Sequence, residues 1–228
     1  MEQIREGLAV HGAVYFAHAQ TEGRGQRGKK WWSAPGENIQ MTLVLQPLQL
    51  AASQPFRLSA TLALAIRDFL SGFVQNGWAI KWPNDVYWGD RKAGGILIEN
   101  VMQAGNWMWA VVGIGININT LHFDAHLPNP TSLRLATQQP TYDTEALARQ
   151  LCLVIEQRWQ QLNSGGWPAI WKQYNQNLYK AGQLQRLKLQ NTTAYYQIKG
   201  VSAQGQLIAG MHNEFRFDHG EVEWMLES

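Results

Sequence analysis

The sequence predicts an α+β protein in which a sheet covered by helices is followed by a smaller all-β unit. Residues 56–73 and 144–162 each place apolar side chains three and four positions apart, the spacing of an amphipathic helix that packs one face on a sheet. Apolar segments of strand length surround the first of these helices. Beyond Gly182 the pattern changes to short alternating segments separated by turns. That pattern is typical of an antiparallel β unit of roughly fifty residues, the size of an SH3-like barrel.

The elements follow from this pattern in chain order. Residues 1–10 are expected to form part of a helix. Residues 21–38 are expected to form a loop, because the glycines of "EGRGQRG" disfavour regular structure. Gly89-Asp90 supplies hairpin turn chemistry, and Asp143 is a suitable N-cap for the second long helix. Strands are expected at residues 13–19, 41–45, 78–82, 94–99 and 106–117.

The composition is that of a globular protein with one large domain, or a medium domain with a small companion. With 45% hydrophobic and 16% charged residues among 228, wholesale disorder is excluded. A formal net charge of +2 is too small to indicate nucleic acid as the main partner. Cys152 is the single cysteine, and the sequence has neither a signal-peptide pattern nor a long apolar run. We therefore expect a cytoplasmic protein without a membrane segment.

The stretch "KWPNDVYWGDRKAGGILIEN", residues 81–100, combines an amide, a carboxylate and an ammonium group on an otherwise apolar background. Pro83 fixes its own φ, so Asn84 and Asp85 are presented on a defined turn. Lys92 precedes a Gly-Gly pair, which removes side chains that would block a ligand from the ammonium group. A lysine beside a carboxylate that can hold Mg²⁺ suits nucleotidyl transfer. The alternative interpretation is an ordinary hairpin with a surface lysine and an Asx turn.

The segment "TEGRGQRGKKWWSAPGEN" alternates glycines with basic residues and ends in two tryptophans, Trp31 and Trp32. Glycine backbone amides and guanidinium groups together suit a loop that cradles phosphates, and the tryptophans could cover a flat ring such as adenine. A solvated basic loop or a nucleic-acid-binding arm is the alternative. The basic residues are Arg24, Arg27, Lys29 and Lys30.

The segment "VVGIGININ", residues 111–119, is not a dinucleotide fingerprint, because it lacks the third glycine and no helix follows it. Two interpretations stay open. It is either a plain core strand, or a strand whose Gly113 and Gly115 let a ligand or another element lie close, ending at Asn117 and Asn119.

Taken together and in this order, "GRGQRGKKWWSAPGEN", "KWPNDVYWGDRKAGGILIE", "GIGININ" and "PTSL" resemble the catalytic domain of biotin protein ligases, also called biotin–[acetyl-CoA-carboxylase] ligases. The resemblance implies a mixed β-sheet catalytic domain of the class II synthetase type over residues 1–180, and an SH3-like barrel over residues 181–228. It implies an enzyme that makes biotinyl-5′-AMP from biotin and ATP, and then transfers biotin to a lysine of a biotin carboxyl carrier protein. It also implies the class without an N-terminal DNA-binding domain, acting as a monomer or homodimer with no nucleic-acid or membrane partner.

The same resemblance assigns roles to individual residues. Lys92 would contact the biotin carboxylate and the α-phosphate, and Asp85 would hold Mg²⁺ or orient the incoming lysine. The implied catalytic residues are Lys92, Asp85 and Arg27, with Asp85 as the metal ligand. The implied residues for biotin and ATP are Gln20, Gly23, Arg24, Gly25, Gln26, Trp31, Asn84, Gly94, Gly95 and Asn117.

The chain departs from the family pattern at two places. Gln26 stands where a second arginine is usual, and so lacks the bidentate, charge-assisted contact of a guanidinium group. A Ser-Thr-Asn segment that binds the ureido ring of biotin in the family is missing upstream of the first helix, for which we expect a start codon further upstream. The rival functions are a lipoate or octanoyl transferase of the same fold, a nucleic-acid-binding module, and a ligase-like protein that binds nucleotide without turnover.

Overall fold

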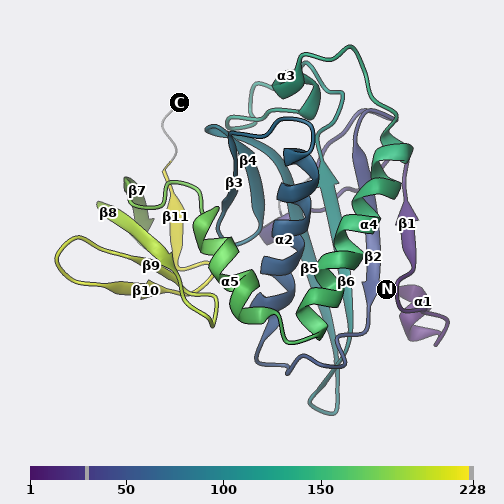
Figure 1. The fold of residues 1–228 in the computed structure, drawn as a ribbon, viewed down its shortest axis with the longest axis horizontal. Helices are drawn as coiled ribbons and strands as arrows, with labels where there is room; N and C mark the ends of the chain where they lie inside the picture. The colour runs from purple at the N-terminus through teal and green to yellow at the C-terminus, as the bar shows by residue number, and fades with distance from the viewer. Residues whose placement is uncertain (29–30, 226–228) are drawn as a thin grey trace.

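Six strands form the first sheet, in the order β1–β2–β6–β5–β4–β3, and helices cover one of its faces (Figure 1). The computed structural model describes residues 1–28 and 31–225, except for the side chains of Glu2 and Arg27. The strands of this sheet are β1 (Val14–Phe16), β2 (Ile39–Leu45), β3 (Trp78–Lys81), β4 (Asp85–Trp88), β5 (Arg91–Gln103) and β6 (Asn106–Ile116). Neighbouring strands pair antiparallel, and parallel pairing occurs at two isolated bridges, Ile80–Leu178 and Lys92–Pro130. The α+β class is confirmed, and the expected mixture of strand directions is limited to these bridges.

Two long helices pack on this sheet, and a shorter one packs against them. They are α2 (Pro55–Ser71), α4 (Thr144–Asn163) and α5 (Trp167–Gln176). Pro55 stands in the first turn of α2, where its missing N–H costs no hydrogen bond. The side chain of Asp143 accepts hydrogen bonds from the backbone N–H groups of Glu145 and Ala146, so the expected N-cap of α4 is confirmed.

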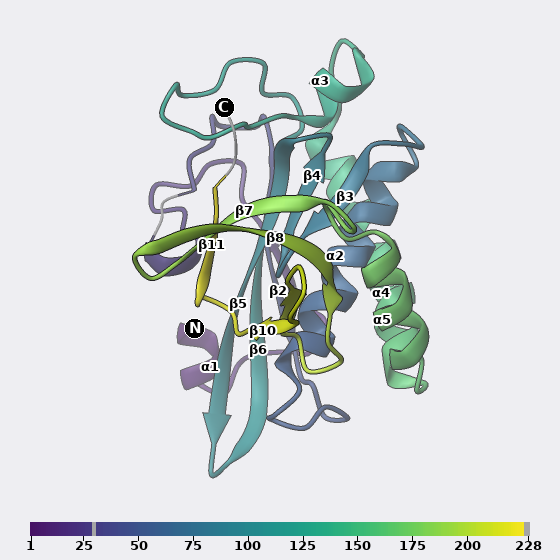
Figure 2. The same ribbon diagram turned by 90° about the vertical axis from the view of Figure 1, so that its left-hand side faces the viewer.

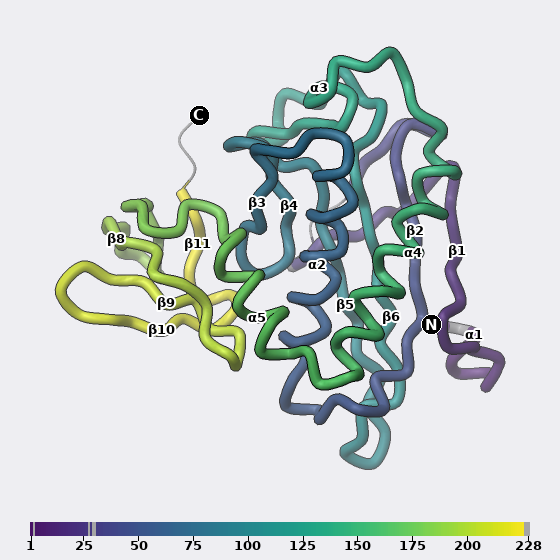
Figure 3. Tube along the Cα trace, in the orientation of Figure 1, coloured from purple at the N-terminus to yellow at the C-terminus, as the bar shows by residue number. Residues whose placement is uncertain are grey.

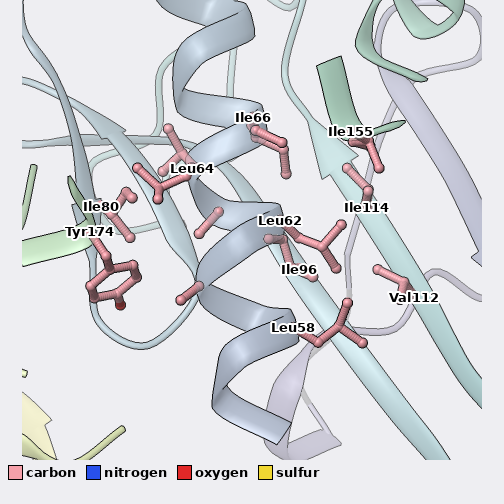
Figure 4. Close-up of a cluster of buried hydrophobic side chains, with 14 of the residues drawn as sticks. Leu58, Leu62, Leu64, Ile66, Ile80, Ile96, Val112, Ile114, Ile155 and Tyr174 are labelled. Atoms are coloured by element: carbon pink, nitrogen blue, oxygen red, sulfur yellow. The ribbon is translucent and has the colours of Figure 1, made fainter. Parts of the chain in front are cut away.

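The core lies between α2 and the sheet (Figure 4). Leu58 and Leu62 of α2 point toward Val112 and Ile114 of β6, and Ile155 of α4 closes one side of the cluster. These side chains are at most 5% exposed, so their burial supplies the main favourable free energy of this layer.

Three elements differ from the expectation. The helix at the start of the chain, α1, covers Glu2–Arg5 and then ends, because Gly7 turns with a φ of +72°. Residues 85–88 form a strand, β4, that the turn-rich sequence around Pro83 concealed, and Gly89-Asp90 is the turn between β4 and β5. A short helix, α3 (Leu133–Thr137), begins at the last residue of the "PTSL" segment, with Ser132 as its N-cap.

The second sheet has five antiparallel strands in the order β10–β9–β8–β7–β11 and is strongly curved (Figure 2). The strands are β7 (Leu184–Leu189), β8 (Thr192–Val201), β9 (Leu207–Ala209), β10 (Phe215–Phe217) and β11 (Val222–Trp224). No pairing between β10 and β11 closes the sheet within the described part of the chain, so it forms an open, barrel-like layer.

The second sheet lies beside α5 and the β3 end of the first sheet (Figure 3). Trp82 Nε1 donates to the carbonyl oxygen of Gly205 at 2.8 Å, and Trp171 Nε1 donates to that of Val201 at 2.8 Å. A Cβ built on Gly205 would lie 2.5 Å from Cγ of Phe56. The second sheet is therefore docked by specific hydrogen bonds onto the turn that precedes β4 and onto α5. Among the described helices, none has the length and apolar character needed to cross a membrane.

Candidate functional site

Residues in register form a row across the face of the first sheet that points away from α2. Asp85 of β4 pairs with Gly95 of β5, which pairs in turn with Gly115 of β6. Gly115 pairs with Gln40 of β2. Paired residues project to the same side of a sheet, and side chains alternate along each strand. The row therefore lies on the opposite face from core side chains such as Ile96. Its two glycines, Gly95 and Gly115, leave the middle of the row without side chains, and we call them the glycine floor.

The ammonium group of Lys92 lies at one end of this row. Its Nζ is 2.7 Å from Oδ1 of Asp85, and the two side chains are 33% and 23% exposed. A Cβ built on Gly95 would lie 3.0 Å from that oxygen and 3.3 Å from Nζ of Lys92. Any larger residue at this position would crowd the ion pair, which gives Gly95 a steric reason to be glycine.

The backbone of Lys92 is fixed on both sides by a segment far along the chain. The N–H of Lys92 donates to the carbonyl oxygen of Asn129 at 2.7 Å, and its carbonyl accepts from the N–H of Thr131 at 2.8 Å. Asn117 joins the same segment, because its Nδ2 donates to the carbonyl of Thr131 at 2.9 Å and its N–H donates to that of Ala93 at 2.8 Å. The lysine thus stands on a rigid base.

Asn84 and Gly94, two further predicted residues, make close contacts with β5 and β6, and their predicted roles in ligand binding stay predictions. Asn84 is 4% exposed, and its Nδ2 donates to the carbonyl oxygen of Ile96, which anchors the turn to β5. A Cβ on Gly94 would lie 2.9 Å from the carbonyl oxygen of Gly115, so the close approach of β5 to β6 requires glycine there.

The loop before β2 folds back over the sheet through Trp31. The N–H of Trp31 donates to the carbonyl oxygen of Gly23 at 2.9 Å. A Cβ on Gly115 would lie 2.6 Å from Cε2 of the indole, so the ring lies directly against Gly115 in the middle of the row. The indole Nε1 is buried and has no hydrogen-bond partner among the described residues. Trp31 therefore brings the loop against the row, whereas Trp32 is 65% exposed. That either ring covers a ligand stays a prediction.

The other predicted residues of the loop are nearer to solvent. Gln20 and Arg24 are exposed, and Gly25 and Gln26 are half-buried, with Gln26 beginning the 3₁₀ turn η1 (Gln26–Gly28). The side chain of Arg27, together with Lys29 and Lys30, lies outside the residues that the structure describes. The predicted roles of these loop residues stay predictions.

Aromatic rings border the lysine-bearing end of the site. Nζ of Lys81 lies 5.7 Å from the ring centroid of Tyr87 and 5.3 Å from that of Trp224 in the second sheet. Burial raises the pKa of Tyr87, and the nearby carboxylate of Asp85 and the ring of Tyr179 raise it further. The phenol is therefore neutral at physiological pH and serves as a hydrogen-bonding and packing group.

The sequence reasoning missed two buried polar residues of the same region. Asn38 is 2% exposed: its Oδ1 accepts from the N–H of Ile118 at 2.8 Å, and its Nδ2 donates to Oγ of Ser33 at 2.7 Å. It thereby fixes the end of the loop to the end of β6. Gln40 is 1% exposed on β2. A polar residue inside "NIQMTLVL" was the available signal for both.

Asp85 is suited to Mg²⁺, because this ion is usually held by one or two carboxylates together with phosphate oxygens. Within residues 1–28 and 31–225, no three His, Cys, Asp or Glu side chains gather as a metal cage. A single carboxylate beside an ammonium group fits an ion that arrives with a phosphorylated ligand.

The arrangement as a whole suits the binding of an anionic group and the stabilisation of developing negative charge. A fixed ammonium group, paired with a carboxylate and set above a glycine floor, costs little reorganisation when charge builds up beside it. The floor and the indole of Trp31 add an apolar surface for the rest of a ligand.

Comparisons with known proteins agree on one family. The model of the biotin/lipoate A/B protein ligase family matches residues 1–117. A biotin–[acetyl-CoA-carboxylase] ligase of Paracoccus denitrificans is 42% identical over 122 residues, which cover 51% of this chain and 49% of that protein. The bifunctional ligase/repressor BirA of Salmonella typhimurium is 31% identical over 147 residues, which cover 64% of this chain and 46% of that protein.

Among solved structures, the biotin protein ligase of Aquifex aeolicus in complex with biotin and ATP has a TM-score of 0.84 at 22% identity, over 99% of this chain and 94% of that one. This similarity confirms the fold, including the two-sheet arrangement. The chain spans about half the length of the curated relatives BirA and the Paracoccus ligase. Since the family model covers just over half of the 228 residues, this chain belongs to the biotin/lipoate A/B protein ligase family.

Proposed function

We propose that this protein is an ATP-dependent biotin ligase that makes biotinyl-5′-AMP and transfers biotin to a lysine of a biotin carboxyl carrier protein. The observation that carries the proposal is the Lys92–Asp85 pair, 2.7 Å apart, above the glycine floor. The names of the Paracoccus and Aquifex relatives support biotin and ATP as the substrates.

In the first step, a biotin carboxylate oxygen attacks the α-phosphorus of ATP, the P–O bond to the β-phosphate breaks, and pyrophosphate leaves. Lys92 would hold the carboxylate against the α-phosphate and stabilise the negative charge that builds up there. Asp85 would keep the ammonium group in place and would be the carboxylate that holds Mg²⁺, which neutralises charge on the phosphates when bound.

In the second step, the amine of the carrier lysine attacks the acyl carbon of the adenylate, AMP leaves, and the amine loses a proton. Asp85 is 23% exposed and, with biotin held at Lys92, would lie beside the reacting carboxyl group, a position from which it could orient the incoming amine. The loop that ends at Trp31, including Gln20, Arg24 and Arg27, would cover the adenylate and exclude water, which otherwise hydrolyses a mixed anhydride.

The test is direct detection of biotinyl-5′-AMP and pyrophosphate by mass spectrometry after mixing the full chain with biotin, ATP and Mg²⁺. Lys92→Ala is expected to lower the rate of adenylate formation by about 10²–10³-fold or more. Lys172→Ala, which removes an exposed lysine on α5, is the matched control and is expected to keep the wild-type rate. Adenylate formation from lipoate or octanoate but not from biotin would contradict the proposal.

The transfer step is tested by adding an apo carrier domain with a single acceptor lysine. We expect its mass to rise by one biotin less one water, and its Lys→Arg form to stay unmodified. Adenylate formation without transfer to any carrier domain would restrict the proposal to its first step.

We also propose that residues 1–180 and 181–228 act as two domains, catalytic and SH3-like. Support comes from the separate sheets, one ending at Ile116 and the other beginning at Leu184. Limited proteolysis should then cut first near residues 180–183. A first cut inside either sheet would contradict this division.

A further inference from the structure

Gln40 is a buried side chain whose polar atoms lack partners. It is 1% exposed, and among the described residues neither its Nε2 nor its Oε1 has a hydrogen-bond partner. Within the described part of the chain it is the one side chain in which a donor and an acceptor are both buried and unpartnered. Buried polar groups in native proteins are almost always paired, so an unpaired amide in the middle of a sheet calls for a ligand or another explanation.

The position of Gln40 places this amide in the candidate site. Gln40 pairs with Gly115, and Gly115 pairs with Gly95, so Gln40 projects from the same face as the Lys92–Asp85 pair. Trp31 lies against Gly115, next to Gln40 in the row, and its Nε1 is a further buried donor without a partner. Near Gly115 there are thus two unpartnered donors, Nε2 of Gln40 and Nε1 of Trp31, and one unpartnered acceptor, Oε1 of Gln40, among the described residues.

The spacing of the row indicates which part of a ligand reaches Gln40. Nζ of Lys92 lies beside Gly95 of β5, and Gln40 stands two strands away on β2, a separation of about 9.5 Å at the usual strand spacing. In biotin, eight bonds separate the carboxyl carbon from the ureido carbon. At roughly 1.2 Å per bond along an extended chain this is about 9–10 Å. A biotin held by its carboxylate at Lys92 therefore brings its ureido group to Gln40.

We infer that Gln40 is a specificity-determining residue that hydrogen-bonds the ureido ring of the substrate, an inference that rests on the proposed function. In a cyclic urea an N–H and the C=O point along the same edge. A primary amide matches this edge: Nε2 of Gln40 donates to the urea oxygen, and Oε1 accepts from the ring N–H. Nε1 of Trp31 supplies a second donor for the urea oxygen, which has two lone pairs.

The edge of adenine offers a similar donor and acceptor pair, to which a glutamine amide can also bind. The distance to Lys92 favours the ureido ring, and the experiment separates the two ligands.

The experiment is isothermal titration of the full-length protein with biotin, with ATP, and with a biotin analogue that keeps the thiolane and valerate but lacks the ureido ring. Gln40→Leu is expected to weaken biotin binding by roughly 10- to 100-fold, and to change ATP binding and analogue binding by less than about twofold. Thr42→Val, two residues along the same face of β2, is the matched control and should bind all three ligands as the wild type does.

A purely structural role for Gln40 predicts a different pattern. Removing an amide that has no partner should leave the denaturation midpoint unchanged or raised, whereas removing a structural hydrogen bond would lower it. Gln40→Glu keeps the shape and the acceptor but loses the N–H donor, and so provides a second variant in which biotin binding should fall.

Four outcomes would overturn the inference. These are wild-type biotin affinity in both Gln40 variants, a selective loss of ATP binding, an equal loss of biotin and analogue binding, and a lowered midpoint in Gln40→Leu. A wild-type protein that does not bind biotin at all would overturn the proposed function and this inference with it. If the wild-type protein forms biotinyl-5′-AMP and both Gln40 variants bind biotin with unchanged affinity, this inference alone would be overturned.

Discussion

The indole of Trp31 and the backbone of Gly115 are in direct contact at the centre of the first sheet, where a Cβ on Gly115 would lie 2.6 Å from the ring. This contact joins the loop before β2 to the row that carries Asp85 and Lys92. A prediction follows from the lack of space between them.

Gly115→Ala should displace Trp31 or strain β6, with a loss of about 1–3 kcal/mol in the free energy of unfolding, as for other overpacked cores. Gly113→Ala is the control on the same strand, because its Cβ would meet its nearest neighbour, the carbonyl oxygen of Leu97, at an ordinary 3.7 Å. Urea denaturation measures the stability, and limited proteolysis measures exposure of residues 20–28. Equal behaviour of the two variants would show that the Trp31 contact does not hold the loop.

Asp85→Asn removes the charge beside Lys92, whereas Asp90→Asn removes a similar ion pair elsewhere on the same hairpin. Asp90 pairs with Nζ of Lys180, also at 2.7 Å. We expect Asp85→Asn to lower adenylation and transfer by about tenfold or more with a stability change below about 1 kcal/mol, because partly exposed ion pairs contribute little. Asp90→Asn should keep both rates. Measured single-turnover rates that fall equally in the two variants would point to a general effect of hairpin stability.

The pair formed by Asp90 also predicts a pH dependence of stability. Hydrogen bonds from Lys180 and then from the hydroxyl of Tyr179 lower the pKa of Asp90 below its ordinary value of 3.8. A group whose pKa is lower in the folded protein contributes stability above its unfolded pKa and loses it as pH falls through the folded pKa. Asp90→Asn should thus be less stable than the wild type at pH 7, and the difference should shrink as the pH falls below 3.8 toward the lowered pKa of Asp90. Urea midpoints measured at pH 7 and over a series of acidic pH values check this, and a difference that stays constant in acid would contradict it.

The close contact between Gly205 and Phe56 of α2 predicts that a side chain at position 205 lowers stability. Its φ is +97°, and a Cβ would lie 2.5 Å from Cγ of Phe56, whereas Gly105 has a φ of +79° and no neighbour within 4 Å. Both glycine-to-alanine changes carry the backbone strain of a positive φ, but Gly205→Ala also adds a clash. Gly205→Ala should therefore lose about 1–3 kcal/mol more than Gly105→Ala in thermal or urea unfolding. A similar loss in both variants would show that the second sheet adapts to the added methyl group.

Gln26→Arg restores the arginine that is usual in the family at this position. A guanidinium group can make bidentate, charge-assisted hydrogen bonds to a phosphate, so we expect slower escape of biotinyl-5′-AMP from the enzyme. Gln49→Arg adds the same charge at an exposed site outside the loop and should leave the escape rate unchanged. The rate is measured by trapping released adenylate. An unchanged rate in Gln26→Arg would show that other residues retain the adenylate.

Local patterns predicted much of the fold. The spacing of apolar residues gave α2 and α4, and the side chain of Asp143 gave the start of α4, because these signals depend on neighbouring residues alone. The strand β4 was missed, since Pro83 and the Asn-Asp pair beside it favour a turn, and pairing with β3 and β5 overrides that preference. The length of the helix at the start of the chain was overestimated, because the turn at Gly7 ends that helix after one turn.

In the candidate site, too, local motifs were predicted and long-range contacts were not. Lys92 and Asp85 are seven residues apart in one hairpin, so a local motif was sufficient to bring them together. Gln40, Asn129 and Thr131 reach the site through strand register and long-range hydrogen bonds, which one sequence does not reveal. The roles of Gln20, Arg24 and Gln26, the oligomeric state and the cytoplasmic location stay predictions.

The segment between β6 and α3 is fastened at both of its ends. Asn117 is bound to Ala93 at one end, Thr131 to Lys92 at the other, and Asn117 to Thr131 across the gap. Residues 121–128 run between these fastenings and turn on themselves, with Asp124 accepting from the N–H groups of His126 and Leu127. The segment is therefore a loop closed at its base by hydrogen bonds, and residues 121–128 are exposed apart from the half-buried Phe123. For protein engineering, a change of length within residues 121–128 should leave the bonds that hold Lys92 in place.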